Sequence, residues 1–318
     1  MTIPRPQLDP DLSLKLADVP LGVELDPGIL KEMRRFAVPA ETYLAGRAIE
    51  REETSIRTAD GFDLPLSVFR PAGGTDANAP CIYWLHGGGM VMGDRFANLD
   101  IPLDWLDRFG AVIVTIDYRL APETSGDTLV EDCFAGLAWI AAHARDLGID
   151  PARIIVAGAS AGGGLAAGTV LMARDRGGPG ILAQILICLM LDHRNDTVST
   201  RQYSGDPGVW TREKNAFGWR SVLGDTAPAD VSPYVSPART TDLAGLPTTY
   251  VDAGTAEVFR DEHVDYASRI WAAGGQAELH LWTGGFHGFG AMFPDATVSV
   301  AARAARSDWL GRILDRTP

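Results

Sequence analysis

Short apolar runs alternate with longer helical patterns along most of this chain, and this alternation limits the folds that are open to it. The helical patterns lie at 127–147, 161–176, 261–274 and 298–315. Strands separated by helices imply a mostly parallel sheet with helices on both faces, so the sequence predicts an α/β fold. The apolar runs are CIYWL at 81–85, AVIVTID at 111–117, RIIVAG at 153–158, ILICLML at 185–191, TTYVDAG at 248–254 and ELHLW at 278–282.

Three segments depart from this alternation. Residues 1–50 carry amphipathic fragments such as 29–36, broken by prolines, which predict helical material and no sheet. From Glu53 onward, alternating residues on both sides of Ala59-Asp60-Gly61 predict a β-hairpin in which the sheet begins. Residues 193–240 contain scattered aromatics and four prolines around a short helical pattern at 212–222, which is typical of an inserted cap.

The charge balance excludes several classes of partner. A formal net charge of -13 opposes binding to nucleic acids and to anionic membrane surfaces. The longest apolar stretch, 181–191, includes Gln184 and is shorter than the roughly 20 residues that span a membrane.

Cys81, Cys133 and Cys188 lie in apolar surroundings, so we expect buried free thiols and neither a disulfide framework nor a metal site.

The start of the chain bears on location. The opening residues MTIPRPQLDPDLSLKL lack a basic start followed by an apolar run, so they do not resemble a secretory signal. We therefore expect a cytoplasmic protein. The sequence leaves the oligomeric state open between a monomer and a homodimer.

The pentapeptide Gly158-Ala159-Ser160-Ala161-Gly162 follows the apolar run RIIVA and precedes a helical pattern. A GxSxG string alone is weak in a chain with 35 glycines. In a strand-turn-helix setting, however, the serine is held in a strained turn that presents its hydroxyl above the sheet edge. The context therefore indicates that Ser160 is a nucleophile.

A glycine-rich segment, His86-Gly87-Gly88-Gly89, follows the run CIYWL. Successive glycines allow backbone N–H groups to approach a developing oxyanion without interference from side chains. With the residue that follows the nucleophile, this predicts an oxyanion hole made by the N–H groups of Gly88, Gly89 and Ala161.

A serine nucleophile needs a base, and His287 is the best placed of the six histidines. It lies in the loop GGFHGFG after the run ELHLW, where glycines let it reach the carboxyl edge of the sheet. The remaining histidines belong to the glycine motif, to helical patterns or to a strand, apart from His193, which starts the insertion.

The acid that orients the base should follow the strand TTYVD. Glu257 fits this position best because it stands just beyond the turn. Asp252 remains an alternative. Asp261 and Glu262 are better explained as acids in the first turn of a helix.

Together with DYRLAPE at 117–123 and EVFRDE at 257–262, these motifs resemble the bacterial hormone-sensitive lipase family of esterases from about residue 50 to the end. The resemblance implies an α/β-hydrolase fold: a catalytic domain of 51–192 and 241–318, and a helical cap made of 1–50 and 193–240. It also places the triad acid on Glu257. One departure is Ala159, because the family usually has an acidic residue before the nucleophile.

The resemblance implies a carboxylesterase that hydrolyses short- to medium-chain esters through an acyl-enzyme, with a small-molecule ester as its partner and no cofactor or metal. The alternatives are an amidase or carbamate hydrolase on the same triad, and a non-catalytic small-molecule receptor, against which His287 argues. Five residues are candidates for the substrate-pocket wall, although residues of these types belong to the core more often than to a pocket: Met90, Met92, Trp210, Phe217 and Trp219.

Overall fold

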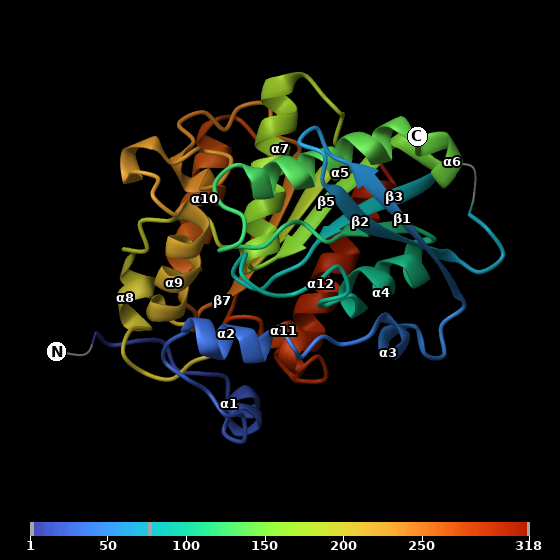
Figure 1. Ribbon diagram of the computed structural model, residues 1–318. Helices are drawn as coiled ribbons and strands as arrows, with labels where there is room; N and C mark the ends of the chain where they lie inside the picture. Colours follow the sequence, from blue (N-terminus) through green and yellow to red (C-terminus); the bar gives the residue numbers. More distant parts are fainter. Residues whose placement is uncertain (1–2, 76–77, 317–318) are drawn as a thin grey trace.

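An eight-stranded sheet forms the centre of the computed structural model, which describes residues 3–75 and 78–316 (Figure 1). The strand order is β1-β2-β4-β3-β5-β6-β7-β8. β1 (Ile49–Arg57) and β2 (Asp63–Pro71) form an antiparallel hairpin, and β2 is also antiparallel to β4. All later pairs are parallel. The later strands are β3 (Ala79–Leu85), β4 (Val112–Ile116), β5 (Ile149–Ala159), β6 (Ala183–Ile187), β7 (Thr248–Gly254) and β8 (Ala277–Trp282).

Helices cover both faces of this sheet, as the alternating pattern predicts. β5 alternates between two cores: Ile154 and Val156 pack on one face, and Ile155 and Ala157 pack on the other. The first core includes residues of α5, α7 and α10, and the second includes residues of α4 and α12. The helices are α4 (Asp100–Phe109), α5 (Thr128–Ala142), α6 (Ala144–Leu147), α7 (Ala161–Arg176), α10 (Arg260–Ala272), α11 (Phe289–Met292) and α12 (Thr297–Leu314).

Three sequence predictions about element bounds are wrong. The sheet begins at Ile49 and not at Glu53, because β1 pairs with β2 along its whole length. The helix predicted at 127–147 is two helices, since the backbone of His143 leaves the helical range (φ -107°, ψ 17°). The run ILICLML is a strand only as far as Ile187, because Cys188 turns away with a φ of 38° and the Met190 N–H then bonds to the Ser160 carbonyl.

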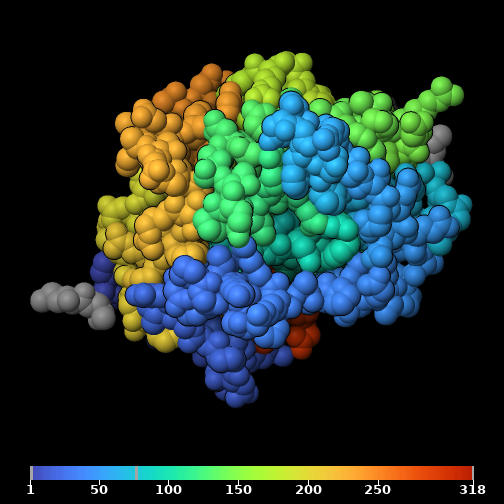
Figure 2. Space-filling model, in the orientation of Figure 1, coloured from blue at the N-terminus to red at the C-terminus, as the bar shows by residue number. Residues whose placement is uncertain are grey.

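Two segments far apart in the sequence lie together beside the sheet. The N-terminal helices α1 (Pro10–Leu16), α2 (Pro27–Met33) and α3 (Ala40–Leu44) precede β1, while α8 (Val198–Gln202) and α9 (Arg212–Leu223) follow β6. The Thr211 hydroxyl donates to the Val23 carbonyl, and the Gly208 N–H donates to the Gly22 carbonyl at 3.3 Å. Figures 1 and 2 show the blue N-terminal segment against the yellow segment that contains α8 and α9. Within the described residues, no helix combines the length and the apolar character needed to cross a bilayer.

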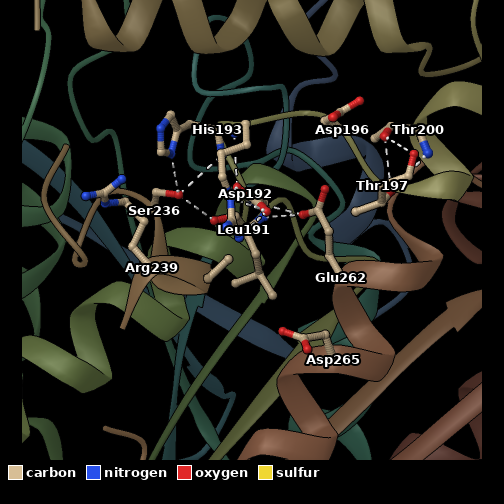
Figure 3. A network of polar contacts seen from close by, with 12 residues as sticks. Leu191, Asp192, His193, Asp196, Thr197, Thr200, Ser236, Arg239, Glu262 and Asp265 are labelled. Carbon is tan, nitrogen blue, oxygen red and sulfur yellow. Dashed lines mark hydrogen bonds and ion pairs between the residues drawn. The ribbon is translucent and has the colours of Figure 1, made fainter. Parts of the chain in front are cut away.

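A buried carboxylate ties α10 to the segment that follows β6 (Figure 3). Glu262, only 4% exposed, accepts hydrogen bonds from the backbone N–H groups of Leu191 and Asp192, both at 3.0 Å. Ser236 continues the network: its hydroxyl donates to the Leu191 carbonyl and accepts from the His193 N–H. Burial, together with the nearby Asp192 carboxylate, raises the pKa of Glu262 well above its ordinary value of 4.5.

The contribution of Glu262 to the free energy of unfolding is expected to fall as pH rises above 4.5. The folded protein retains the Glu262 proton and the unfolded chain releases it, so a rising pH favours unfolding by up to about 1.4 kcal/mol per pH unit. Glu262→Gln removes this titration. Denaturant melts from pH 5 to 8 give the free energy of unfolding at each pH. Its slope against pH should be less negative for Glu262→Gln than for the wild type and for Asp265→Asn, an exposed neighbour on α10. Equal slopes in all three proteins would contradict a protonated Glu262.

Candidate active site

Ser160 occupies a strained turn between β5 and α7, with φ 56° and ψ -121°. Its N–H donates to the Ile187 carbonyl at 2.8 Å, and its carbonyl accepts from the N–H of Met190 at 3.0 Å. These two bonds hold the turn against the end of β6. A Cβ on Gly162 would overlap the backbone carbonyls of Leu85 and His86, so the close crossing of β3 and α7 requires glycine there.

The structure brings Ser160, His287 and Glu257 together from three separate segments. Ser160 Oγ lies 2.9 Å from His287 Nε2, and His287 Nδ1 lies 2.9 Å from Glu257 Oε2. Glu257 is 1% exposed and His287 is 7% exposed, so this contact is shielded from water. The arrangement allows the imidazole to accept the serine proton while the carboxylate orients the ring.

Asp252, the alternative acid, has other partners. Its Oδ2 accepts from Arg306 Nε at 2.7 Å and from Trp282 Nε1 at 3.3 Å. In this geometry Glu257, and not Asp252, is the carboxylate that contacts His287.

A second histidine contacts Glu257 from the side away from His287. His263 Nδ1 lies 3.2 Å from Glu257 Oε1, and His263 Nε2 donates to the Leu189 carbonyl at 2.8 Å. Burial lowers the pKa of His263, although the Glu257 carboxylate opposes this shift. The sequence pattern around His263 predicts only a helix residue. The only available signal was that its helix follows Glu257 closely, in the first turn of α10.

The glycine loop lies directly against the serine. A Cβ on Gly87 would lie 3.3 Å from the Cβ of Ser160. Gly87, Gly88 and Gly89 line the same cavity as Ser160 and His287. Ala161 is the first residue of α7, where a backbone N–H has no partner within its own helix. All three N–H groups predicted for the oxyanion hole therefore belong to segments that adjoin the nucleophile.

Gly88→Ala is expected to lower kcat/KM for an ester by at least about 100-fold, the scale of losing one oxyanion donor. Gly88 has a φ of 116°, and an added Cβ would overlap the Met92 carbonyl, so the loop must move. Gly274→Ala is the matched control, because Gly274 also has a positive φ but has open space around it. The control should lose about 1 kcal/mol of stability and keep its activity. Steady-state rates and thermal melts of both variants test this, and an active Gly88→Ala protein would refute the role of the loop.

A cavity of about 340 Å³ adjoins Ser160, and a second of about 500 Å³ lies beyond His287 and Trp210, which line both. Of the five predicted wall residues, Met92 and Trp210 line the first cavity. The other three do not. Met90 is fully buried in the core, with its side chain beside Gly164 of α7. Phe217 packs against the same core from α9, and Trp219 contacts His193.

Three potential metal ligands meet at this site, although the sequence shows no ligand spacing. One ligand atom each of Cys188, Glu257 and His287 lies within 4.8 Å of the other two. Burial raises the pKa of the Cys188 thiol, which disfavours the thiolate that binds metals. The His287 nitrogens already contact Ser160 and Glu257, so a metal would have to displace those hydrogen bonds. The donor set therefore fits a hydrogen-bonded triad better than a metal centre.

Comparisons with known proteins identify the family of this chain. Residues 82–291 match a family described as alpha/beta hydrolase fold. The chain is 31% identical to Esterase LipI of Mycobacterium tuberculosis, over 92% of each chain, and 30% identical to Carboxylesterase NlhH of the same species, over 91% of this chain and 90% of the other. Among solved structures, a bacterial heroin esterase superimposes with a TM-score of 0.88 at 35% identity, covering 97% of this chain and 98% of the other. The esterase LipW of Mycobacterium marinum gives 0.87 at 30% identity, covering 99% of each chain. The chain therefore belongs to the alpha/beta hydrolase fold family, among its hormone-sensitive-lipase-like esterases.

Proposed function

We propose that this chain is a carboxylesterase with Ser160 as nucleophile, His287 as general base and Glu257 as the triad acid. One observation carries the proposal: Ser160 Oγ and Glu257 Oε2 lie 2.9 Å from opposite nitrogens of the His287 ring. A hydroxyl, an imidazole and a carboxylate in this order form the arrangement that activates serine for acyl transfer. The names of the relatives, esterase and carboxylesterase, support the same reaction class.

In this mechanism His287 Nε2 takes the Ser160 proton as Oγ bonds to the ester carbonyl carbon. The N–H groups of Gly88, Gly89 and Ala161 stabilise the resulting oxyanion, and loss of one such donor typically costs about 3 kcal/mol. The C–O bond to the alcohol then breaks, and His287 gives its proton to the departing oxygen. Water repeats the sequence on the acyl-enzyme and frees Ser160. Glu257 orients His287 throughout and stabilises its charged form.

The first cavity supports short- to medium-chain esters as substrates. Its volume of about 340 Å³ is within the range of small-molecule sites. Apolar side chains that suit a hydrocarbon acyl chain line much of its wall: Leu25, Met33, Met92, Ile101 and Val209. Leu25 and Met33 come from the N-terminal segment and Val209 from the insertion, which supports a cap made of 1–50 and 193–240 over the catalytic domain.

Hydrolysis of p-nitrophenyl butanoate and of the matching butanoyl anilide by one preparation tests this function. We expect the ester to react at least about 100-fold faster in kcat/KM, because an alkoxide or phenoxide leaves more easily than an amine, and EDTA to leave the rate unchanged. Faster cleavage of the anilide would instead indicate an amidase. Saturable binding of the ester without turnover would indicate a receptor, and loss of activity with EDTA would exclude the mechanism.

A further inference from the structure

A buried polar pair lines the cavity that contains Ser160. Arg306 on α12 is 3% exposed, and Asp252 near the end of β7 is fully buried. Arg306 Nε donates to Asp252 Oδ2 at 2.7 Å. Among the described residues, Arg306 Nη1 and Asp252 Oδ1 have no hydrogen-bond partner. The pair therefore keeps one donor and one acceptor unpaired beside a cavity lined mostly by apolar side chains. Because each atom has less than 1 Å² of exposed surface, a bound group reaches them only when neighbouring side chains move.

The sheet register places this pair within reach of the reacting serine. Ala159 pairs with Ile187 on β6, and Ile187 pairs with Asp252 on β7. Asp252 thus lies two strand spacings, about 10 Å, from the residue that precedes the nucleophile. All three residues line the cavity. Ala159, the departure from the family pattern noted above, contributes only a methyl group to this part of the cavity wall.

The charges of the pair select the kind of group that it can bind. The Arg306 guanidinium and the Asp252 carboxylate compensate each other, so the pair favours a neutral group that both donates and accepts a hydrogen bond. A hydroxyl or a primary carboxamide meets both requirements. A carboxylate would face the like charge of Asp252, and a hydrocarbon would leave both free atoms unpaired.

The second cavity indicates which part of the ester reaches the pair. It contacts His287 and Glu257 but not Ser160, whereas the first cavity contains Ser160, the glycine loop and Arg306. In the acyl-enzyme the acyl group is bonded to Ser160 Oγ, so it cannot occupy the second cavity, which Ser160 does not line. The acyl group then lies in the first cavity, toward Asp252 and Arg306.

We propose that this chain prefers esters whose acyl group ends in a hydroxyl or carboxamide, which the Asp252–Arg306 pair binds. The proposal rests on the esterase function proposed above. It assigns the pair a role in substrate selection, separate from the chemistry at Ser160.

Size-matched p-nitrophenyl esters test the preference in the wild-type protein. The acyl chains, four to eight carbons long, end in a methyl, a hydroxyl or a carboxylate; heptanoate, 6-hydroxyhexanoate and the adipate monoester form one such set. At the best chain length we expect kcat/KM for the hydroxyl ester to exceed that for the methyl ester at least about tenfold, with the carboxylate slowest. Equal rates, or a fastest carboxylate, would overturn the preference while leaving the esterase function in place. Absence of turnover for every ester would overturn both.

Removal of the pair gives a second readout. In Asp252→Leu/Arg306→Met the ion pair is replaced by apolar side chains, a change that buried pairs often tolerate. The ratio of hydroxyl to methyl rates should fall to one or below. Arg312→Gln, which removes an exposed arginine from the same helix, should keep the wild-type ratio. A double variant that retains the tenfold preference would refute the role of the pair, and if it does not fold, the wild-type rates decide alone.

Discussion

Ser160→Ala is expected to lower kcat for an ester by about 10⁴-fold or more, because no other group in the triad can form the acyl-enzyme. The change removes one oxygen from a half-buried side chain and leaves the backbone bonds of the turn intact. Folding should therefore be preserved. Initial rates with p-nitrophenyl butanoate, together with thermal melts, measure both effects.

A matched serine variant controls for nonspecific effects. Ser221→Ala removes a hydroxyl on α9 that donates to the Phe217 carbonyl and does not line either cavity beside His287. It should keep nearly full activity. If Ser160→Ala retained a tenth of the wild-type rate in a preparation free of other esterases, Ser160 would not be the nucleophile.

The second large effect separates the two candidate acids. Glu257→Gln should lower kcat by about 10⁴-fold, because an amide no longer holds the imidazole in the tautomer that accepts the serine proton. Asp252→Asn should cost far less activity. It should instead cost more stability, about 3–5 kcal/mol, because it leaves the buried Arg306 charge without its counter-ion.

Measurement of kcat and of the free energy of unfolding on both variants distinguishes these roles. His287→Ala belongs to the same series and should match Ser160→Ala in severity, since the two side chains act as a unit. If Asp252→Asn lost more activity than Glu257→Gln while remaining folded, the triad acid would have to be reassigned to Asp252.

Local patterns in the sequence were sufficient for the sheet and for the main helices that cover it. The predicted helix at 161–176 coincides with α7, and the pattern at 212–222 is α9 but for one residue. Patterns were insufficient where a long-range contact overrides a continuous apolar run. The strand in ILICLML stops where Cys188 takes a φ of 38°, after which the Met190 N–H bonds to the carbonyl of Ser160, 30 residues earlier in the chain. α4 was also not predicted.

In the candidate site too, local patterns predict some residues, and the roles of others depend on long-range contacts. Ser160, His287 and the glycine loop could be predicted because each follows its own strand at the carboxyl edge of the sheet. The sequence favours Glu257 over Asp252 only by its place beyond the turn and by the family resemblance. It does not reveal Arg306, which α12 brings to Asp252 from 54 residues away. His263 was missed for a similar reason. Its contact with Glu257 depends on how the first turn of α10 packs, which residue spacing alone does not reveal.

The wall residues were the least predictable part. Met90 and Met92 are two positions apart, yet Met90 is in the core and Met92 lines the cavity. The difference arises from backbone turns after the glycine loop, including the positive φ of Met90. Residue type alone could not have distinguished these two methionines.

Covalent labelling tests the central claim, that Ser160 is the activated nucleophile, most directly. The native protein is treated with paraoxon, digested and mapped by mass spectrometry, beside Ser160→Ala and a heat-denatured sample. We expect one diethylphosphoryl group per chain on the peptide that carries Ser160, and none in either control, because only the folded triad activates the hydroxyl. A label on another residue, or equal labelling of Ser160→Ala, would contradict the account.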